Sequence, residues 1–180
     1  MKRYIKCSSK PDKRFSGNWM DRVDIAEVTD DVDLLELYSY DPDCTVRWNV
    51  VQNPNTPIDI LVRLADDEDY TIRRDVAANV KIPQDVLIKL SDDPENAVLE
   101  AVASNPNTPE DILIKLCDRL VQDPSGGGHY VWLALAQNPN TPVTSLKQLA
   151  TNTQNGYVYS LIRENLTSRG IDPWSYQPLS

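Results

Sequence analysis

The sequence predicts an all-α fold, a short solenoid of about four to five two-helix repeats with a period of about 26 residues. Three observations lead to this prediction. The pentapeptide NPNTP occurs three times, apolar residues recur in phase with it, and two leucines follow each copy at a constant distance. A period in the twenties with this much register is typical of solenoids, in which neighbouring repeats bury a continuous core.

One asparagine per repeat sets the register: Asn53, Asn79, Asn105, Asn138 and Asn165, separated by 26, 26, 33 and 27 residues. Apolar residues stand seven and three positions before each asparagine, and leucines stand eight and eleven positions after the first four. Spacings of three and four predict the buried faces of two helices. The predicted core positions are Val46, Ile72, Val98, Val131 and Val158; Val50, Val76, Val102, Leu135 and Ile162; Leu61, Leu87, Leu113 and Leu146; and Leu64, Leu90, Leu116 and Leu149.

The first helix of each repeat is predicted to begin at a Thr-Pro pair. A threonine such as Thr56 can act as N-cap, and the proline after it suits the first helical position, where its missing N–H has no partner to lose. Further apolar residues, such as Val62 and Ile114, make this helix apolar nearly all round. That composition predicts that the first helices lie between adjacent repeats.

The NPNTP turn is predicted to separate two helices and not to bind a ligand. Its asparagine tolerates the left-handed conformation that ends the second helix, and the proline after it prevents the helix from continuing. The worn copy NVKIP, residues 79–83, lacks the threonine and the first proline, so we expect it to be the least rigid of these turns. The predicted structural caps are Asn53, Thr56, Pro57, Asn79, Pro83, Asn105, Thr108, Pro109, Asn138, Thr141 and Pro142.

The repeated segments carry a family resemblance. They read VRWNVVQNPNTPIDILVRLADD from Val46, IRRDVAANVKIPQDVLIKLSDD from Ile72, VLEAVASNPNTPEDILIKLCD from Val98 and, more weakly, VWLALAQNPNTPVTSLKQLA from Val131. This order resembles the leucine-rich repeat variant family, a relative in style of HEAT and armadillo solenoids, over about residues 34–166. The resemblance implies a right-handed superhelix of alternating α and short 3₁₀ helices. The period is longer than is usual in that family, which leaves open a full second α-helix, as in HEAT-like arrays. The iron–sulfur cluster of the family's founding member is not expected, because the cysteines here are isolated.

Three regions are expected along the chain. Residues 1–23 form a basic N-terminal arm or a cap, residues 24–168 form the repeats, and residues 169–180 form a C-terminal tail. Leu34 and Leu37 are assigned to the two leucine positions of a first half-repeat. An insertion near residues 119–129, with Gly126–Gly128 and His129, accounts for the 33-residue step and is expected to be flexible and exposed, either neutral or a recognition element.

Charge and cysteine content exclude several classes of protein. Residues 1–20 hold six Lys or Arg and one Asp, whereas the remaining 160 residues hold 12 basic and 26 acidic side chains. A region with this much negative charge repels phosphate backbones. We therefore expect an unknown and possibly basic protein partner and no nucleic acid. No apolar run is long enough to span a membrane. Three isolated cysteines argue against a disulfide framework and a metal site, and they favour a cytoplasmic location. No cofactor is expected, and a monomer is favoured.

Two polar patterns have a structural and a functional interpretation. The acidic turns, residues 41–43, 66–69 and 92–95, lack the pattern of a calcium loop, so we interpret them as N-caps of the second helices. Arg47 and Arg73 each follow an aspartate, Asp41 and Asp67, by six residues. We predict an ion pair within each repeat and not a phosphate-binding ladder, because the other repeats have no basic residue at this position.

No arrangement of residues suggests catalysis, so the sequence predicts a non-enzymatic protein–protein interaction module. Its binding surface is expected on the solvent side of the second helices, about 200° from the buried valines, at Trp48, Arg74, Glu100 and Leu133. An exposed tryptophan beside charged residues is typical of an interface hot spot, but Trp48 could equally pack on the N-terminal segment. The alternative function is an acidic inhibitor that binds a basic, nucleic-acid-binding protein by presenting phosphate-like charge.

Overall fold

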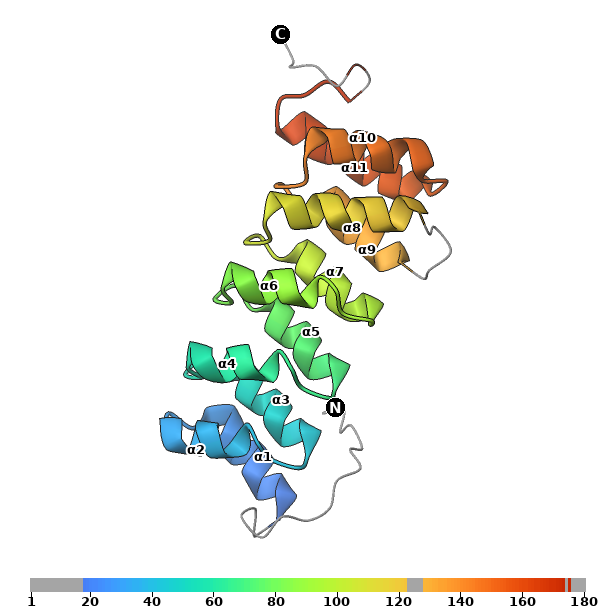
Figure 1. Ribbon diagram of the computed structural model, residues 1–180. Coiled ribbons are helices and arrows are strands. Elements are labelled where there is room, and N and C mark those ends of the chain that lie inside the picture. Colours follow the sequence, from blue (N-terminus) through green and yellow to red (C-terminus); the bar gives the residue numbers. More distant parts are fainter. Residues whose placement is uncertain (1–17, 123–127, 174, 176–180) are drawn as a thin grey trace. The chain divides into compact units, whose positions relative to one another are not determined.

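The computed structural model in Figure 1 describes residues 18–122, 128–173 and 175. These residues form eleven α-helices and no strand, which confirms the predicted all-α class. None of the described helices is long and apolar enough to cross a membrane. The helices are α1 (Trp19–Val28), α2 (Val32–Tyr38), α3 (Cys44–Gln52), α4 (Ile58–Leu64), α5 (Tyr70–Ala78), α6 (Gln84–Leu90), α7 (Asn96–Ser104), α8 (Glu110–Gln122), α9 (His129–Gln137), α10 (Val143–Asn152) and α11 (Gly156–Ser168).

The chain forms two compact units, Met1–Val76 and Ala77–Ser180, and within each unit the helices alternate between two layers (Figure 1). In the first unit α1 packs on α3, while α2 and α4 lie in the other layer. In the second unit α7 packs on α9 and α9 on α11, while α8 packs on α10. Both helices of each repeat are α-helices and not alternating α and 3₁₀, so the HEAT-like alternative is correct. The right-handed superhelix stays a prediction.

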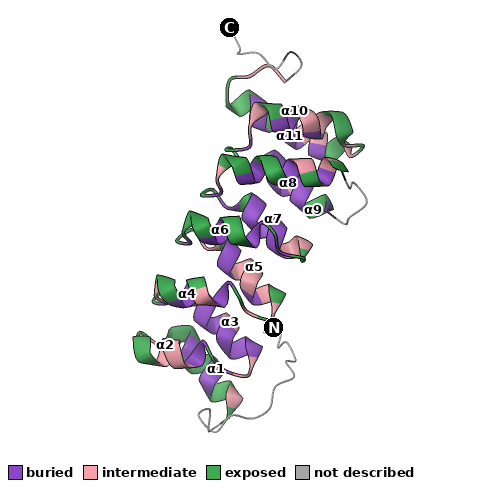
Figure 2. Cartoon of the chain, viewed as in Figure 1, coloured by how far each residue is buried: buried purple, intermediate pink, exposed green. Residues whose placement is uncertain are grey.

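The predicted core positions are all buried. None of the eighteen valine, isoleucine and leucine side chains of the register is more than 3% exposed, and most are fully enclosed. Figure 2 shows the same pattern, with α3 buried along most of its length and α2 and α4 exposed on their outer sides. Because burying one such side chain stabilises a fold by about 2 kcal/mol, the register makes a large contribution to the stability of the repeats.

Two details of the apolar pattern differ from the prediction. Leu34 and Leu37 are only partly buried, and Leu35 and Tyr38 occupy the core of the first half-repeat instead, at 0% and 8% exposure. Shifting a helical assignment by one residue rotates it by about 100°, so the neighbouring side chains point away from the core. Val62 and Ile114, expected between repeats, are 36% and 37% exposed, so one side of the first helices faces solvent.

The repeat asparagines are not left-handed. Asn53, Asn105 and Asn138 have φ of −70°, −69° and −66° with extended ψ. Each is buried, and its carboxamide joins two repeats. Asn138, for example, donates to the carbonyl oxygens of Ala103 at 2.7 Å and of Asn105 at 3.2 Å, while its own side-chain oxygen accepts the N–H of Asn140 at 2.9 Å.

These bonds form a ladder in the second unit. The carboxamide of each repeat asparagine donates to the backbone oxygen of the asparagine one repeat earlier, from Asn105 to Asn79, from Asn138 to Asn105 and from Asn165 to Asn138. Carbonyl groups at the end of a helix lack an intrahelical partner, and the next repeat supplies one here. The asparagine therefore ties repeats together, a role that a turn-forming residue alone would not require.

The threonines also act differently from the predicted N-caps. Thr141 is fully buried, and its hydroxyl donates to the carbonyl oxygen of Leu135, six residues earlier, at 2.7 Å. Thr56 and Thr108 make the same bond to Val50 and Val102. The N-cap positions of α4 and α10 are occupied by Pro57 and Pro142, one residue before the helix, and neither makes a side-chain cap. The threonine therefore completes the end of the preceding helix.

Near the N-terminal end and in the insertion, the helices extend further than predicted from the sequence. α1 begins at Trp19 and crosses the expected boundary between residues 23 and 24. α8 continues through Arg119 to Gln122, and Leu120 is buried, so the first part of the insertion is helical. Gly126 and Gly127 lie outside the described residues, and His129 begins α9. α11 ends at Ser168, just before the expected tail.

The cysteines correct one expectation. Cys44, the first residue of α3, is disulfide-bonded, so the prediction that the cysteines are isolated is wrong for this residue. Cys117 on α8 is a free, fully buried thiol. Burial raises the pKa of Cys117 to about 12, because the apolar surroundings disfavour the thiolate. The cytoplasmic location stays a prediction.

Candidate protein-interaction surface

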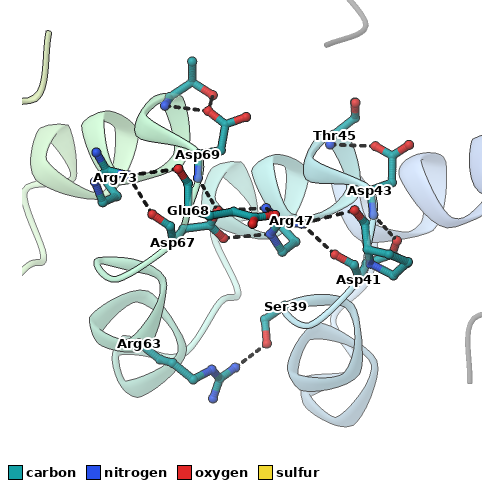
Figure 3. A network of polar contacts seen from close by, with 12 residues as sticks. Ser39, Asp41, Asp43, Thr45, Arg47, Arg63, Asp67, Glu68, Asp69 and Arg73 are labelled. Atoms are coloured by element: carbon teal, nitrogen blue, oxygen red, sulfur yellow. Dashed lines mark hydrogen bonds and ion pairs between the residues drawn. The ribbon is translucent and has the colours of Figure 1, made fainter. Parts of the chain in front are cut away.

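Buried arginine–carboxylate contacts connect the acidic turns of the first unit (Figure 3). Arg47 forms two parallel bonds with the carboxylate of Asp67, Nε–Oδ2 at 2.7 Å and Nη2–Oδ1 at 2.8 Å. Its remaining nitrogen, Nη1, donates to the backbone oxygen of Asp41 at 2.8 Å. Arg73 makes the equivalent backbone contact with Asp67 at 2.7 Å. The arginines therefore tie each turn to the helix after it.

The prediction that Arg47 pairs with Asp41 within one repeat is therefore wrong. Arg47 pairs with a carboxylate 20 residues later in the chain, because the carboxylate of Asp41 is already bound by Arg22 at 2.6 Å. Burial opposes the charged form of Arg47, but the hydrogen bond and attraction to Asp67 outweigh it, so the pKa of Arg47 is raised. These arginines hold turns together and are not available to a phosphate ligand.

The acidic turns cap helices, as predicted. Asp43 accepts the N–H of Thr45 at the start of α3, and Asp69 accepts that of Thr71 at the start of α5, both at 2.8 Å. Glu95 takes the same position before α7 without a side-chain cap bond. Within the described part of the chain, no group of three or more histidine, cysteine or acidic side chains is arranged to hold a metal ion.

The predicted surface residue Trp48 lies at the centre of a small polar cluster on α3 and α5, which we call the Asp75 cluster (Trp48, Gln52, Arg74 and Asp75). The carboxylate of Asp75 accepts bonds from Trp48 Nε1 at 2.6 Å, from Gln52 Nε2 at 2.8 Å and from Arg74 Nε at 2.6 Å. Trp48 is half-buried, while the side chain of Arg74 is 41% exposed. One carboxylate therefore fixes an indole and a guanidinium side by side at the surface.

The other two predicted residues, Glu100 on α7 and Leu133 on α9, are half-buried in the second unit. The structure brings Trp48 and Arg74 together within the first unit. Because the two units are described separately, the row of four stays a prediction. The surface predicted from the sequence did not include Gln52 or Asp75. Asp75 follows Trp48 by 27 residues, one repeat plus one, and this spacing was the available signal.

Carboxylates dominate the surface of the first unit. Residues 18–76 contain fifteen Asp or Glu, five Arg and no Lys. Each of the five arginines is hydrogen-bonded to a carboxylate or a backbone oxygen: Arg22, Arg47, Arg63, Arg73 and Arg74. Arg63 also lies over the ring of Tyr40, at 4.1 Å from its centroid. Arg22 and Arg47 are buried, while the side chains of Arg63 and Arg74 are 34% and 41% exposed. Over residues 18–76 the exposed carboxylates therefore outnumber the exposed arginines.

His129, the single histidine, does not form an acid–base pair. It is exposed at the start of α9, and its Nδ1 lies 3.4 Å from the side-chain nitrogen of Asn155.

Comparison with known proteins bears on the repeat itself. The family model described as leucine rich repeat variant matches residues 45–69. The predicted family resemblance is confirmed. The matched segment contains nearly all of α3, the first NPNTP turn, α4 and the acidic turn that ends at Asp69. No curated protein and no solved structure matches the chain.

The matched leucine rich repeat variant segment holds the residues described above as structural. It includes Arg47, Asn53, Thr56 and Asp67, whose side chains join helices and turns. The match is to a structural repeat and not to an enzyme family. Trp48 lies in the same leucine rich repeat variant segment, but its indole donates to Asp75 in the surface cluster.

Proposed function

We propose that the protein is a non-enzymatic repeat module that binds a protein partner through the solvent side of its second helices, with the Asp75 cluster as its centre. Repeat arrays of this kind expose extended surfaces made of equivalent positions in successive repeats. Tryptophan and arginine are the residues that most often dominate binding energy at protein interfaces. The observation that carries the proposal is the fixed pair of Trp48 and Arg74 on one carboxylate.

Pre-organisation strengthens this argument. A side chain that is already held in one conformation loses little conformational entropy on binding. The short bond from Trp48 to the Asp75 carboxylate holds the indole in place while part of its surface stays in contact with solvent. The cluster therefore has the properties of a binding anchor before any partner arrives.

Affinity capture from the native cell extract tests the proposal. The wild-type chain and Trp48→Ala are compared, with Tyr130→Ala as a matched control, because Tyr130 is 64% exposed on α9 and outside the cluster. We expect Trp48→Ala to weaken capture of the specific partner by about tenfold or more, and Tyr130→Ala to leave it unchanged. Circular dichroism of all three proteins establishes that they are folded. Equal capture by wild type and Trp48→Ala would contradict the proposal.

The acidic first unit favours one second candidate, an inhibitor that occupies a basic protein by presenting carboxylates in place of phosphates. A 20-residue lysine-rich peptide is a suitable probe. An inhibitor of this class binds the peptide more weakly by about a hundredfold between 50 and 300 mM salt, and the exposed carboxylates Asp66 and Glu68 contribute. Trp48→Ala leaves such binding unchanged, which separates it from the hot-spot interface.

A further inference from the structure

The outer side of α1 combines acidic and apolar residues in an unusual way. Its buried residues Arg22, Val23 and Ala26 face α3 and the core. At 100° per residue the opposite arc of about 160° carries three acidic and three apolar residues in alternation and no basic residue. We call this arc the α1 outer face; in order around the helix it consists of Glu27, Met20, Asp24, Val28, Asp21 and Ile25, all exposed.

Among the described residues, α1 packs on α3 and α2, and all six residues of the α1 outer face stay exposed. The terminal repeats of an array normally have a polar outer face, because nothing covers them. Here Met20, Ile25 and Val28 are 47%, 40% and 76% exposed. The pattern continues into the start of α2, where Val32 is 50% exposed beside exposed aspartates at positions 30, 31 and 33. So much apolar surface on a terminal helix favours a covering segment.

The segment that fits this face precedes it in the chain. Residues 1–17 end directly before Asn18, the N-cap of α1. They contain six Lys or Arg and one Asp, together with the apolar residues Tyr4, Ile5 and Phe15. Both the charge and the apolar content complement the α1 outer face. Seventeen extended residues span up to about 55 Å, far more than the roughly 15 Å length of a ten-residue helix.

We propose that residues 1–17 bind the α1 outer face within the same molecule, with basic side chains against Asp21, Asp24 and Glu27 and apolar side chains between them. A segment tethered next to its site acts at an effective concentration of about a millimolar, so even weak contacts keep it bound. The bound segment shields the exposed apolar side chains of α1 and neutralises part of the acidic unit. This inference is independent of the partner proposed for the Asp75 cluster.

Amide hydrogen exchange of α1 in the full-length chain tests the inference. The variant Lys10→Glu/Lys13→Glu/Arg14→Glu reverses three charges of the segment, and Lys81→Glu/Lys89→Glu/Lys147→Glu makes the same change in charge at exposed positions of the second unit. A reducing agent is present, so that the disulfide bond of Cys44 does not contribute to the protection of α1 against exchange. We expect amides of α1 to exchange about fivefold to tenfold faster in the first variant and at the wild-type rate in the second.

A charge swap completes the test. Adding Asp21→Lys, Asp24→Lys and Glu27→Lys to the reversed segment restores opposite charges, so protection of α1 should return, while amides of α3 serve as an internal reference throughout. Unchanged exchange of α1 on charge reversal would overturn the inference, as would equal loss in both triple variants. Failure of the swap to restore protection counts against specific binding to this face.

Discussion

The guanidinium of Arg47 forms two parallel hydrogen bonds with the carboxylate of Asp67, 20 residues later in the chain, at 2.7 and 2.8 Å. Both side chains are nearly enclosed, at 8% and 5% exposure. The pair joins the start of α3 to the acidic turn before α5, so it connects one repeat to the next. A paired charge of this kind is stable only while both partners remain.

The first prediction concerns this pair. Asp67→Ala leaves the Arg47 guanidinium buried without its carboxylate, and we expect a loss of about 3 kcal/mol in the free energy of unfolding. The exposed pair of Lys115 and Asp92 is the control, because its side chains are 42% and 72% exposed. Lys115→Ala should cost less than about 0.5 kcal/mol. Urea denaturation measures the free energy of unfolding of both variants. Equal losses would show that the buried pair stabilises the fold no more than the exposed pair.

A second prediction concerns the asparagine ladder. Asn138→Asp keeps the oxygen that accepts from Asn140 but removes the amide that donates to Ala103 and Asn105. The substitution also places a carboxylate beside two buried carbonyl oxygens, so we expect a loss of about 3 kcal/mol or more. Asn140→Asp, which changes an exposed amide bonded to Pro106, should cost about 1 kcal/mol or less. Similar melting temperatures for the two variants would reject the ladder as an inter-repeat tie.

A third prediction separates the two roles of threonine in the turn. An N-cap role is preserved by aspartate, which is among the best N-caps. Thr141 instead donates to the carbonyl oxygen of Leu135 in a fully buried site, and aspartate cannot donate when ionised. We therefore expect Thr141→Asp to destabilise by about 2–4 kcal/mol. Thr141→Ser, which retains the hydroxyl, should cost about 1 kcal/mol, the value of one methyl group. If thermal unfolding shows that Thr141→Asp is as stable as the wild type, the result would support the N-cap role instead.

The Cys117 thiol provides a prediction about pH. Because burial raises its pKa to about 12 in the folded chain, against an ordinary value near 9, the folded state holds its proton more tightly than the unfolded state. The resulting stability is complete below about pH 9 and is lost as the pH rises from about 9 to 12. At pH 8, alkylation of native Cys117 should be about a hundredfold slower than in urea, or slower still, because the thiolate is scarce and enclosed. Reaction at comparable rates would show that the site opens readily.

The worn turn NVKIP supports a prediction about local stability. Ile82 stands where the other repeats have threonine; it is buried, at 3% exposure, but has no hydroxyl to donate to a helix end. We therefore expect amides of residues 80–82 to exchange faster than those of the NPNTP turns. Hydrogen exchange that shows equal protection in all of these turns would contradict this prediction.

Much of the fold was determined by local regularity. The spacing of valines, isoleucines and leucines relative to one asparagine identified eighteen buried positions of the repeats, because helical periodicity places residues three and four apart on the same side. The same regularity failed at the first half-repeat, where Leu34 and Leu37 stand next to the correct Leu35 and Tyr38. That segment has no NPNTP copy before it, so no marker was present from which its register could be predicted.

The candidate surface was predicted only in part. Trp48 and Arg74 follow from the direction of the buried valines, whereas their shared partner Asp75 depends on how α3 and α5 pack. The partner of Arg47 was missed for a related reason. Sequence spacing favours Asp41, but that carboxylate is bound by Arg22, and competition among three charged groups is decided by their positions in space.

By itself, the sequence determined the repeat, its helices and its core, because these depend on periodicity and on local turn chemistry. Only the tertiary structure decided what the recurring positions of each repeat do. Asn138 and Thr141 read locally as a helix stop and a helix start, yet one ties two repeats and the other completes the preceding helix. The physical reason is that unpaired carbonyl groups at helix ends take the nearest donor, and packing determines which donor is nearest.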